Sequence, residues 1–226
     1  MKKNNFLFIL GCITALIISS TGCSKEETKD NAIKDIDGNV YHSITIGTQT
    51  WMLENLKVTK FASGTPISVV TDSSVWNHLL TPACCWSYND IANKNTYGAL
   101  YNGYAAGVSN ICPEGWHVPS SIEWTTLATN LGGADVAGGK LKETGTNHWW
   151  NPNQGATNET GFTAVPGGTR FLNGDFDGLG ASCVFWSTFA YDDNNANAWD
   201  MSYVNTVFYS GYYSKKCGYS IRCIKD

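Results

Sequence analysis

Residues 112–124 read CPEGWHVPSSIEW, and this stretch decides how the chain folds. Pro119 disfavours helical backbone at the residue before it, and Ser120 is a residue type that caps a helix N-terminus. Glu123 stands three residues after Ser120, the spacing of a capping box. Gly132-Gly133 ends the pattern, as glycine does at a helix C-terminus. The sequence therefore predicts a strand, a proline turn and a capped helix. The apolar side of this helix is expected to contain Ile122, Leu127 and Leu131.

The same stretch holds a histidine, two tryptophans and a glutamate, which could be mistaken for a functional site. We interpret them as scaffold. Trp116 and Trp124 are expected to pack the core, Glu123 to cap its own helix, and His117 to be a hydrogen-bonded structural residue.

Composition indicates one loop-rich domain. The chain has 226 residues, of which only 15% are charged, with 9 Trp, 11 Tyr and 23 Gly. This mixture suits a fold held together by aromatic packing more than one built from long solvated helices. The formal net charge is −4 and basic residues do not cluster, so nucleic acid is excluded as a partner.

The N-terminus predicts export. Lys2 and Lys3 precede an apolar run over residues 6–18, and Ser20-Thr21-Gly22-Cys23 follows. This is the order of a secretory signal, too short for a membrane span, and it resembles a bacterial lipobox. The sequence predicts a lipoprotein signal peptide over residues 1–22, lipidation of Cys23 and a flexible tether over residues 23–32. The membrane is then reached only through the lipid anchor.

Residues 24–27, SKEE, follow Cys23 directly. They resemble the acidic tag that sends Bacteroidetes lipoproteins to the outer face of the outer membrane. The alternative is a solvated linker. We favour the first interpretation, which predicts an outer membrane lipoprotein facing the cell exterior.

Six of the eight cysteines remain when Cys12 of the signal peptide and Cys23 are set aside. An even number in an exported domain predicts disulfides. Spacing alone cannot choose among the fifteen possible pairings. We expect Cys112 to pair with Cys223, because this bridge would tie the chain end to the central helix, and Cys183 to pair with Cys217. Cys84 and Cys85 either form a vicinal bridge or remain thiols. Zinc is not expected, because the sequence has no Cys-x-x-Cys pair.

Alternation and turn residues predict the remaining elements. A turn at residues 35–39 precedes a hairpin of residues 40–46 with 49–52. Asp135 is expected to cap a short helix that runs to Leu141, and Pro166-Gly167-Gly168 to turn a hairpin within residues 161–171. Further strands are expected at residues 184–189, 198–204, 207–212 and 219–224.

Several loops are rich in aromatic rings and amides. Rings stack on sugar faces and amides bond to hydroxyls, but the same residues also make loop cores. Two adjacent tryptophans cannot both point the same way in extended chain, so at least one of Trp149 and Trp150, in the loop of residues 145–160, could face solvent and meet a ligand. The alternative is that both fold back under the loop. The candidate ligand-binding residues are Tyr97, Tyr101, Trp149, Trp150, Asn153, Asp193 and Asn195.

Acidic side chains in connecting segments suggest calcium as a possible cofactor. Clustered carboxylate and amide oxygens bind Ca²⁺, although Asp and Asn also favour turns for backbone reasons. The candidate metal ligands are Asp175, Asp177 and Asp192.

Taken in order, six motifs resemble the Fibrobacter succinogenes major paralogous domain family over about residues 33–226. The resemblance implies an exported surface lipoprotein with a single domain there. The motifs are DIDGNVY at residues 35–41, QTWMLENLK at 49–57, TYGALYN at 96–102, CPEGWHVP at 112–119, FWS at 185–187 and SIRCIKD at 220–226.

A more distant similarity concerns the fold. Residues 115–124, GWHVPSSIEW, are similar to the tryptophan, arginine, leucine, proline pattern of sulfatase-modifying-factor proteins, with His117 in place of the arginine. The similarity implies an α+β, C-type lectin-like fold: irregular antiparallel sheets, a few short helices, long loops, and chain ends near each other. The copper-binding cysteine pair of the formylglycine-generating enzymes has no match, so that oxidase chemistry is not carried over.

No nucleophile elbow, metalloprotease helix or phosphate loop occurs in the sequence. We therefore expect a surface-anchored binding module without catalysis, which recognises glycan or protein ligands through its loops. The alternatives are an enzyme of the sulfatase-modifying or glycan-hydrolase type, and a structural surface or pilus component.

Overall fold

The computed structural model describes residues 32–226 besides Met1, and residues 32–226 form one compact unit. The predicted signal peptide, Cys23 and most of the tether lie outside the described residues. The described domain is mixed α+β, with mostly antiparallel sheets and few short helices, in line with the predicted class.

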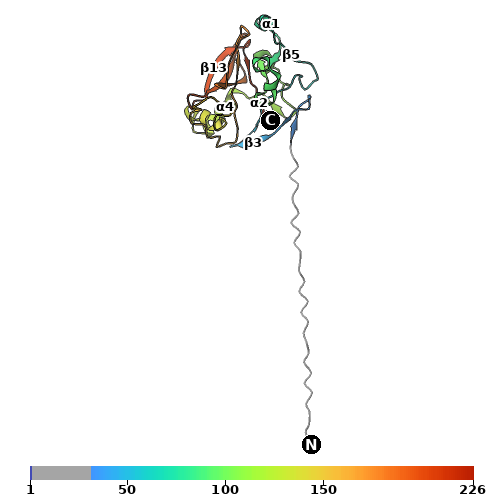
Figure 1. The fold of residues 1–226 in the computed structure, drawn as a ribbon. Coiled ribbons are helices and arrows are strands. Elements are labelled where there is room, and N and C mark those ends of the chain that lie inside the picture. The colour runs from blue at the N-terminus through green and yellow to red at the C-terminus, as the bar shows by residue number, and fades with distance from the viewer. Residues whose placement is uncertain (2–31) are drawn as a thin grey trace. The chain divides into compact units, whose positions relative to one another are not determined.

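The largest sheet has nine strands and runs in the order β13-β12-β11-β9-β14-β7-β6-β5, with β10 paired to β9. Most of its pairs are antiparallel, but β9 with β11 and β5 with β6 are parallel. Figure 1 shows β13 and β5, the two ends of this order, at different sides of the domain. Its strands are β5 (Ser68–Val69), β6 (Ala83–Cys85), β7 (Leu100–Asn102), β9 (Gly167–Arg170), β10 (Phe176–Leu179), β11 (Ser182–Ala190), β12 (Asn195–Ser202), β13 (Tyr209–Ser214) and β14 (Gly218–Tyr219).

A second sheet joins the two ends of the domain. Its order is β3-β4-β15-β8, all antiparallel, and Ile224 near the C-terminus lies opposite Trp51. Figure 1 accordingly shows the C-terminus beside the blue strands that begin the domain. The strands are β3 (Ser43–Ile46), β4 (Gln49–Met52), β8 (Trp116–His117) and β15 (Ile224–Lys225), while β1 (Ile33–Lys34) pairs with β2 (Val40–Tyr41) on its own.

The predicted central helix forms as expected at its N-terminus. The Ser120 hydroxyl accepts from Glu123 N–H at the start of α4, and the Glu123 carboxylate accepts from Ser120 N–H, which completes the capping box. Trp124 and Leu127 are buried, but Ile122 is 77% exposed, so its place on the apolar side was wrong. The buried side of α4 is instead the side that carries Trp124, whose indole stacks on Phe185. The described helices are α1 (Ser73–His78), α2 (Lys94–Tyr97), α3 (Gly103–Ala106), α4 (Ser121–Asn130) and α5 (Ala134–Leu141), with 3₁₀ turns at Ser87–Asn89 and Ile91–Asn93.

Two other local predictions were wrong. Residues 161–165 form no strand, because Thr163 adopts a positive φ of 53°, and Gly167-Gly168 begins β9 instead of turning a hairpin. Gly168 is needed there, since a Cβ would lie 2.6 Å from the backbone oxygen of Asp177 on the paired β10. Asp135 lies in the first turn of α5, but Gly133 is the capping residue.

The disulfide between Cys112 and Cys223 is confirmed. The predicted Cys183–Cys217 bridge is wrong: both are separate buried thiols, Cys183 within β11 and Cys217 just before β14. Cys84 and Cys85 also remain thiols, buried in β6. Burial raises the pKa of the Cys84, Cys85 and Cys183 thiols, to about 12, 11 and 12, which makes them weak nucleophiles.

His117 closes the turn between β8 and α4. Its Nδ1 lies 2.6 Å from Asp226 Oδ1 and its Nε2 lies 2.9 Å from Glu123 Oε1. Burial opposes protonation of His117, but the bonds to Asp226 and Glu123 outweigh it and raise its pKa. Burial likewise opposes ionisation of Glu123, but the Ser120 and His117 bonds lower its pKa. His117 is thus structural, as predicted, while Trp116 is only half-buried.

This cluster predicts a pH dependence of stability. A raised histidine pKa stabilises the fold below the ordinary value of 6.5 and the gain is lost as pH rises. A lowered glutamate pKa stabilises it above 4.5 and the gain is lost as pH falls. We expect the thermal midpoint of the wild type to exceed that of His117→Asn most between these two values. A difference that stays constant from pH 4 to 9 would contradict the assignment.

Candidate functional site

The long segment between α5 and β9, residues 142–166, is held by a buried lysine. Lys142 Nζ donates to three backbone carbonyls: Gln154 at 3.0 Å, Ser202 at 2.9 Å and Asn205 at 2.8 Å. Burial lowers the pKa of Lys142 to about 8. The three acceptors match the three N–H groups of an ammonium. Lys142 therefore ties this loop to the connection between β12 and β13.

The two adjacent tryptophans of the loop point in different directions, as predicted. Trp149 is 1% exposed and its Nε1 donates to Ala164 O at 2.9 Å, so its prediction as a ligand residue was wrong. Asn153 is also buried, and its amide donates to Glu143 O and Gly145 O. Both side chains build the loop, because their polar groups bond to its backbone. Trp150 is 55% exposed.

Trp150 is held in place by a backbone hydrogen bond and by a contact with another ring. Its backbone N–H donates to Gly180 O at 2.7 Å, and its ring meets that of Tyr203 edge-on at 5.7 Å. A Cβ at Gly180 would lie 2.4 Å from the indole nitrogen, and the φ of Gly180 is +86°, so glycine is needed there. An exposed ring fixed in this way loses little entropy when a ligand stacks on it.

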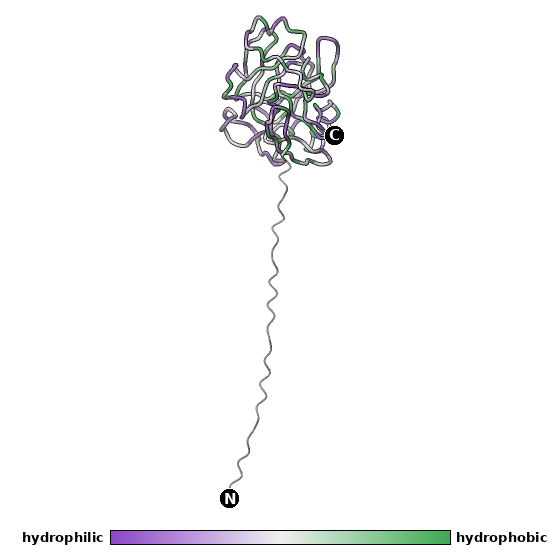
Figure 2. The backbone as a smooth tube through the Cα atoms, turned by 90° about the vertical axis from the view of Figure 1, so that its right-hand side faces the viewer, coloured by the Kyte–Doolittle hydropathy of each residue, from purple (hydrophilic) through white to green (hydrophobic). Residues whose placement is uncertain are grey.

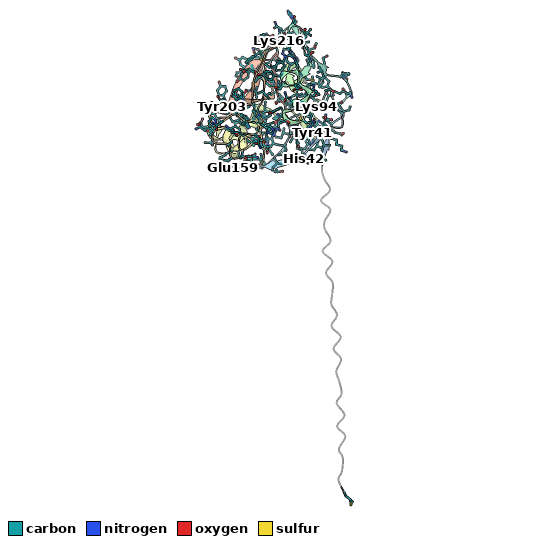
Figure 3. The ribbon with its side chains drawn as sticks, in the orientation of Figure 1. Tyr41, His42, Lys94, Glu159, Tyr203 and Lys216 are labelled. Carbon is teal, nitrogen blue, oxygen red and sulfur yellow. A yellow bond between two sulfur atoms is a disulfide. The ribbon has the colours of Figure 1, made fainter. Side chains whose placement is uncertain are left out.

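Tyr97 contacts the same region through Gly167 and His148. Gly180 N–H donates to Pro166 O, and Gly167 packs against Tyr97. The Tyr97 ring meets that of His148 edge-on at 5.7 Å. We call Tyr97, His148, Trp150 and Tyr203 the Trp150 surface. Figure 3 shows Tyr203 at the periphery of the domain.

Polar groups accompany these rings. His148 Nδ1 lies 2.8 Å from Glu143 Oε2, which orients the imidazole. Burial, and after it the Glu143 charge, raises the pKa of Tyr97, so its hydroxyl stays protonated. Within residues 32–226, neither the Tyr97 hydroxyl nor His148 Nε2 has a protein hydrogen-bond partner. Both are available to a ligand hydroxyl.

The remaining predicted ligand residues lie elsewhere. Tyr101 was wrong, since it is fully buried in β7 and its hydroxyl donates to Val58 O at 2.8 Å. Asp193 and Asn195 lie at the turn between β11 and β12, where the Asn195 amide donates to both carboxylate oxygens of Asp192. Tyr97 contacts His148 in the loop that also carries Trp150, whereas Asp193 and Asn195 lie at the turn between β11 and β12.

The predicted calcium ligands are not brought together. Asp175 accepts from the Asn173 amide in a turn, Asp177 lies on β10, and Asp192 accepts from the backbone of Asn194 and Asn195. Within the described part of the chain, no three His, Cys, Asp or Glu side chains are grouped as metal ligands would be. Asp175 and Asp192 shape turns, the alternative that the sequence had left open, while Asp177 lies within a strand.

The sequence did not point to Tyr203, Glu143 or Lys142. Glu143 stands five residues before His148, a spacing with no fixed meaning in a loop. Tyr203 follows β12, and its backbone N–H donates to Ala181 O, a contact between segments far apart in the sequence. The described helices include none that is long and apolar enough to cross a membrane, and Figure 2 shows hydrophobic stretches interspersed with hydrophilic ones throughout the domain.

Comparison with known proteins bears on the family. No curated protein and no solved structure matches the chain. The model of the Fibrobacter succinogenes major domain matches residues 44–225, from the strand β3 to the last strand β15. The matched region contains the nine-stranded sheet, nearly all of the four-stranded sheet that joins the chain ends, the Cys112–Cys223 bridge and the Trp150 surface. The chain therefore belongs to the Fibrobacter succinogenes major domain family.

Proposed function

We propose that this chain is a surface-anchored lipoprotein whose domain binds glycan, either free or carried by a surface protein, through the Trp150 surface. The observation that carries the proposal is the environment of Trp150. Of the nine tryptophans it alone is more than half exposed, and it is braced by Tyr203 and by the backbone of Gly180. A rigid, exposed indole offers an apolar face to a sugar ring.

The polar groups around the indole suit hydroxyl ligands. Sugars present donors and acceptors at once, and the Tyr97 hydroxyl and His148 Nε2 each serve either role, according to the tautomer of the histidine. The Glu143 carboxylate fixes the imidazole at 2.8 Å. Such groups give orientation and specificity, while the stacked ring supplies contact area.

The anchor rests on the sequence. The lipobox-like residues 20–23 and the acidic residues 24–27 support attachment through Cys23 at the outer face of the outer membrane. For the domain we propose a C-type lectin-like arrangement, which the short helices, the long loop of residues 142–166 and the pairing of β4 with β15 support.

Binding to a glycan array, followed by titration of the strongest glycan, tests the proposal. We expect Trp150→Ala to weaken binding about tenfold, roughly 1.4 kcal/mol, because stacking area is lost. Ile122→Ala is the matched control: Ile122 is 77% exposed on α4, away from this surface, and its loss should leave affinity unchanged. Wild-type affinity in Trp150→Ala would reject this site. Repeating the array with a chelator tests whether binding depends on calcium, the possible cofactor that the sequence suggested.

A further inference from the structure

A second hollow lies where α3 meets the turn between β11 and β12. It has a volume of about 280 Å³, and its walls include Tyr104, Ser187, Thr188 and Lys215. Gly103, Gly107, Ala190 and Ala196 leave its other walls without bulk. Pockets for drug-sized ligands start at about 300 Å³, so this one is sized for a small molecule such as one monosaccharide.

Lys215 is fixed in this pocket by four hydrogen bonds. Its backbone N–H donates to Asn194 O at 2.7 Å and its carbonyl accepts from Gly103 N at 2.7 Å. Its Nζ donates to Asp192 O at 2.8 Å and Asp193 O at 3.1 Å. A Cβ at Gly103 would lie 2.7 Å from Lys215 Cα, so glycine permits this close contact. A lysine held in this way has already lost the rotamer freedom that a ligand would otherwise have to remove.

One N–H group of the Lys215 ammonium bonds to no acceptor among the described residues. The ammonium carries three N–H groups, and two of them bond to the backbone carbonyls. Among the described residues, no further acceptor bonds to Lys215 Nζ. The third N–H is therefore available to a ligand oxygen.

The charge of the pocket indicates the kind of ligand. Lys215 is the one charged side chain among its lining residues. The Asp192 carboxylate interacts with the Lys215 charge, but it is not part of the lining and it accepts hydrogen bonds from the backbone of Asn194 and Asn195 within its own turn. A cation without a carboxylate in the lining favours a ligand with a negative group, because a charge-assisted hydrogen bond is stronger than a neutral one.

We propose that this pocket binds an acidic sugar residue. Its carboxylate would meet Lys215 Nζ, its ring would lie against Tyr104, and a hydroxyl would bond to Thr188. The inference rests on the proposed glycan-binding function and adds the class of sugar: a uronic or similar acid, held apart from the Trp150 surface. The aromatic wall of Tyr104 and the Thr188 hydroxyl suit a pyranose, and the lysine distinguishes an acidic from a neutral one.

Titration of the full chain with the methyl glycosides of glucuronic acid and glucose, followed by NMR, tests the pocket directly. We expect the glucuronide to bind at least tenfold more tightly than the glucoside. Lys215→Met should remove this preference. Lys216→Met is the matched control, because the neighbouring Lys216 donates to Asn77 O outside the pocket and should keep wild-type affinity. Figure 3 shows Lys216 away from Tyr203.

Thr188→Val is a second test that does not depend on the folding of Lys215→Met. Thr188 is exposed, and valine keeps the shape of its side chain. This variant should weaken the glucuronide several-fold with an unchanged thermal midpoint. Equal affinity for the two glycosides, or a glucuronide affinity that Lys215→Met leaves intact, would overturn the inference. Trp150→Ala separates the two proposals: it should leave the free glucuronide unaffected while weakening the longer glycan.

Discussion

Removing the Cys112–Cys223 bridge is expected to lower the free energy of unfolding by about 4–5 kcal/mol. The two cysteines are 111 residues apart in sequence, so the bridge closes a loop that spans half the chain. A cross-link of this length restricts the unfolded chain strongly, and the chain-entropy model gives about 4.7 kcal/mol for a loop of roughly 100 residues. The bridge also joins the turn before β8 to the residue before β15, and these two strands pair with each other.

Chemical denaturation of Cys112→Ala/Cys223→Ala measures the loss, and the thermal midpoint should fall by roughly 8–20 °C for a domain of this size. A reducing agent provides the control. It should lower the midpoint of the wild type towards that of the double variant and leave the double variant unchanged. If reduction also destabilised the variant, the other cysteines would be forming a second disulfide, and equal stability of the variant and the unreduced wild type would contradict the prediction.

The sequence predicted best where local chemistry and long-range packing agree. The capping box of α4 depends on Ser120 and Glu123 alone, and the Cys112–Cys223 pair follows from the need to tie the chain end to the core. The hairpin around residues 161–171 failed because Thr163 takes a positive φ, fixed by Asn158 through two hydrogen bonds. A β-branched residue rarely adopts that conformation, so its sequence gives no warning.

The site was predicted in part, and the reason is burial. Local pattern identified the Trp149-Trp150 pair and the need for one to face solvent, but which one depends on Ala164 O, a partner fifteen residues away that accepts from Trp149. Tyr101 resembles a loop residue in sequence, yet β7 lies between β14 and β6 in the middle of the largest sheet. Tertiary position decides whether an aromatic ring serves the core or a ligand.

Both arginines of the chain, Arg170 and Arg222, are fully buried, and neither takes part in an ion pair among the described residues. Arg222 lies over the Phe162 ring at 4.4 Å. Its Nη2 donates to Asn55 Oδ1 at 2.6 Å and its Nη1 to Phe162 O at 2.6 Å. Its charge is thus met by neutral acceptors and by aromatic faces, which a planar guanidinium suits better than an ammonium does.

We expect Arg222→Met to lower the free energy of unfolding by roughly 2–6 kcal/mol, because two buried acceptors lose their donors at about 1–3 kcal/mol each. The free energy of unfolding of Arg222→Lys should lie between those of Arg222→Met and the wild type, since one ammonium cannot reproduce the planar guanidinium that reaches both Asn55 and Phe162. Lys225→Met, an exposed change in β15, should stay within about 0.5 kcal/mol of the wild type in the same denaturation series. If the free energy of unfolding of Arg222→Met equalled that of Lys225→Met, the arginine would not stabilise the core. The β4 segment and the chain end would then be held together by the disulfide and strand pairing alone.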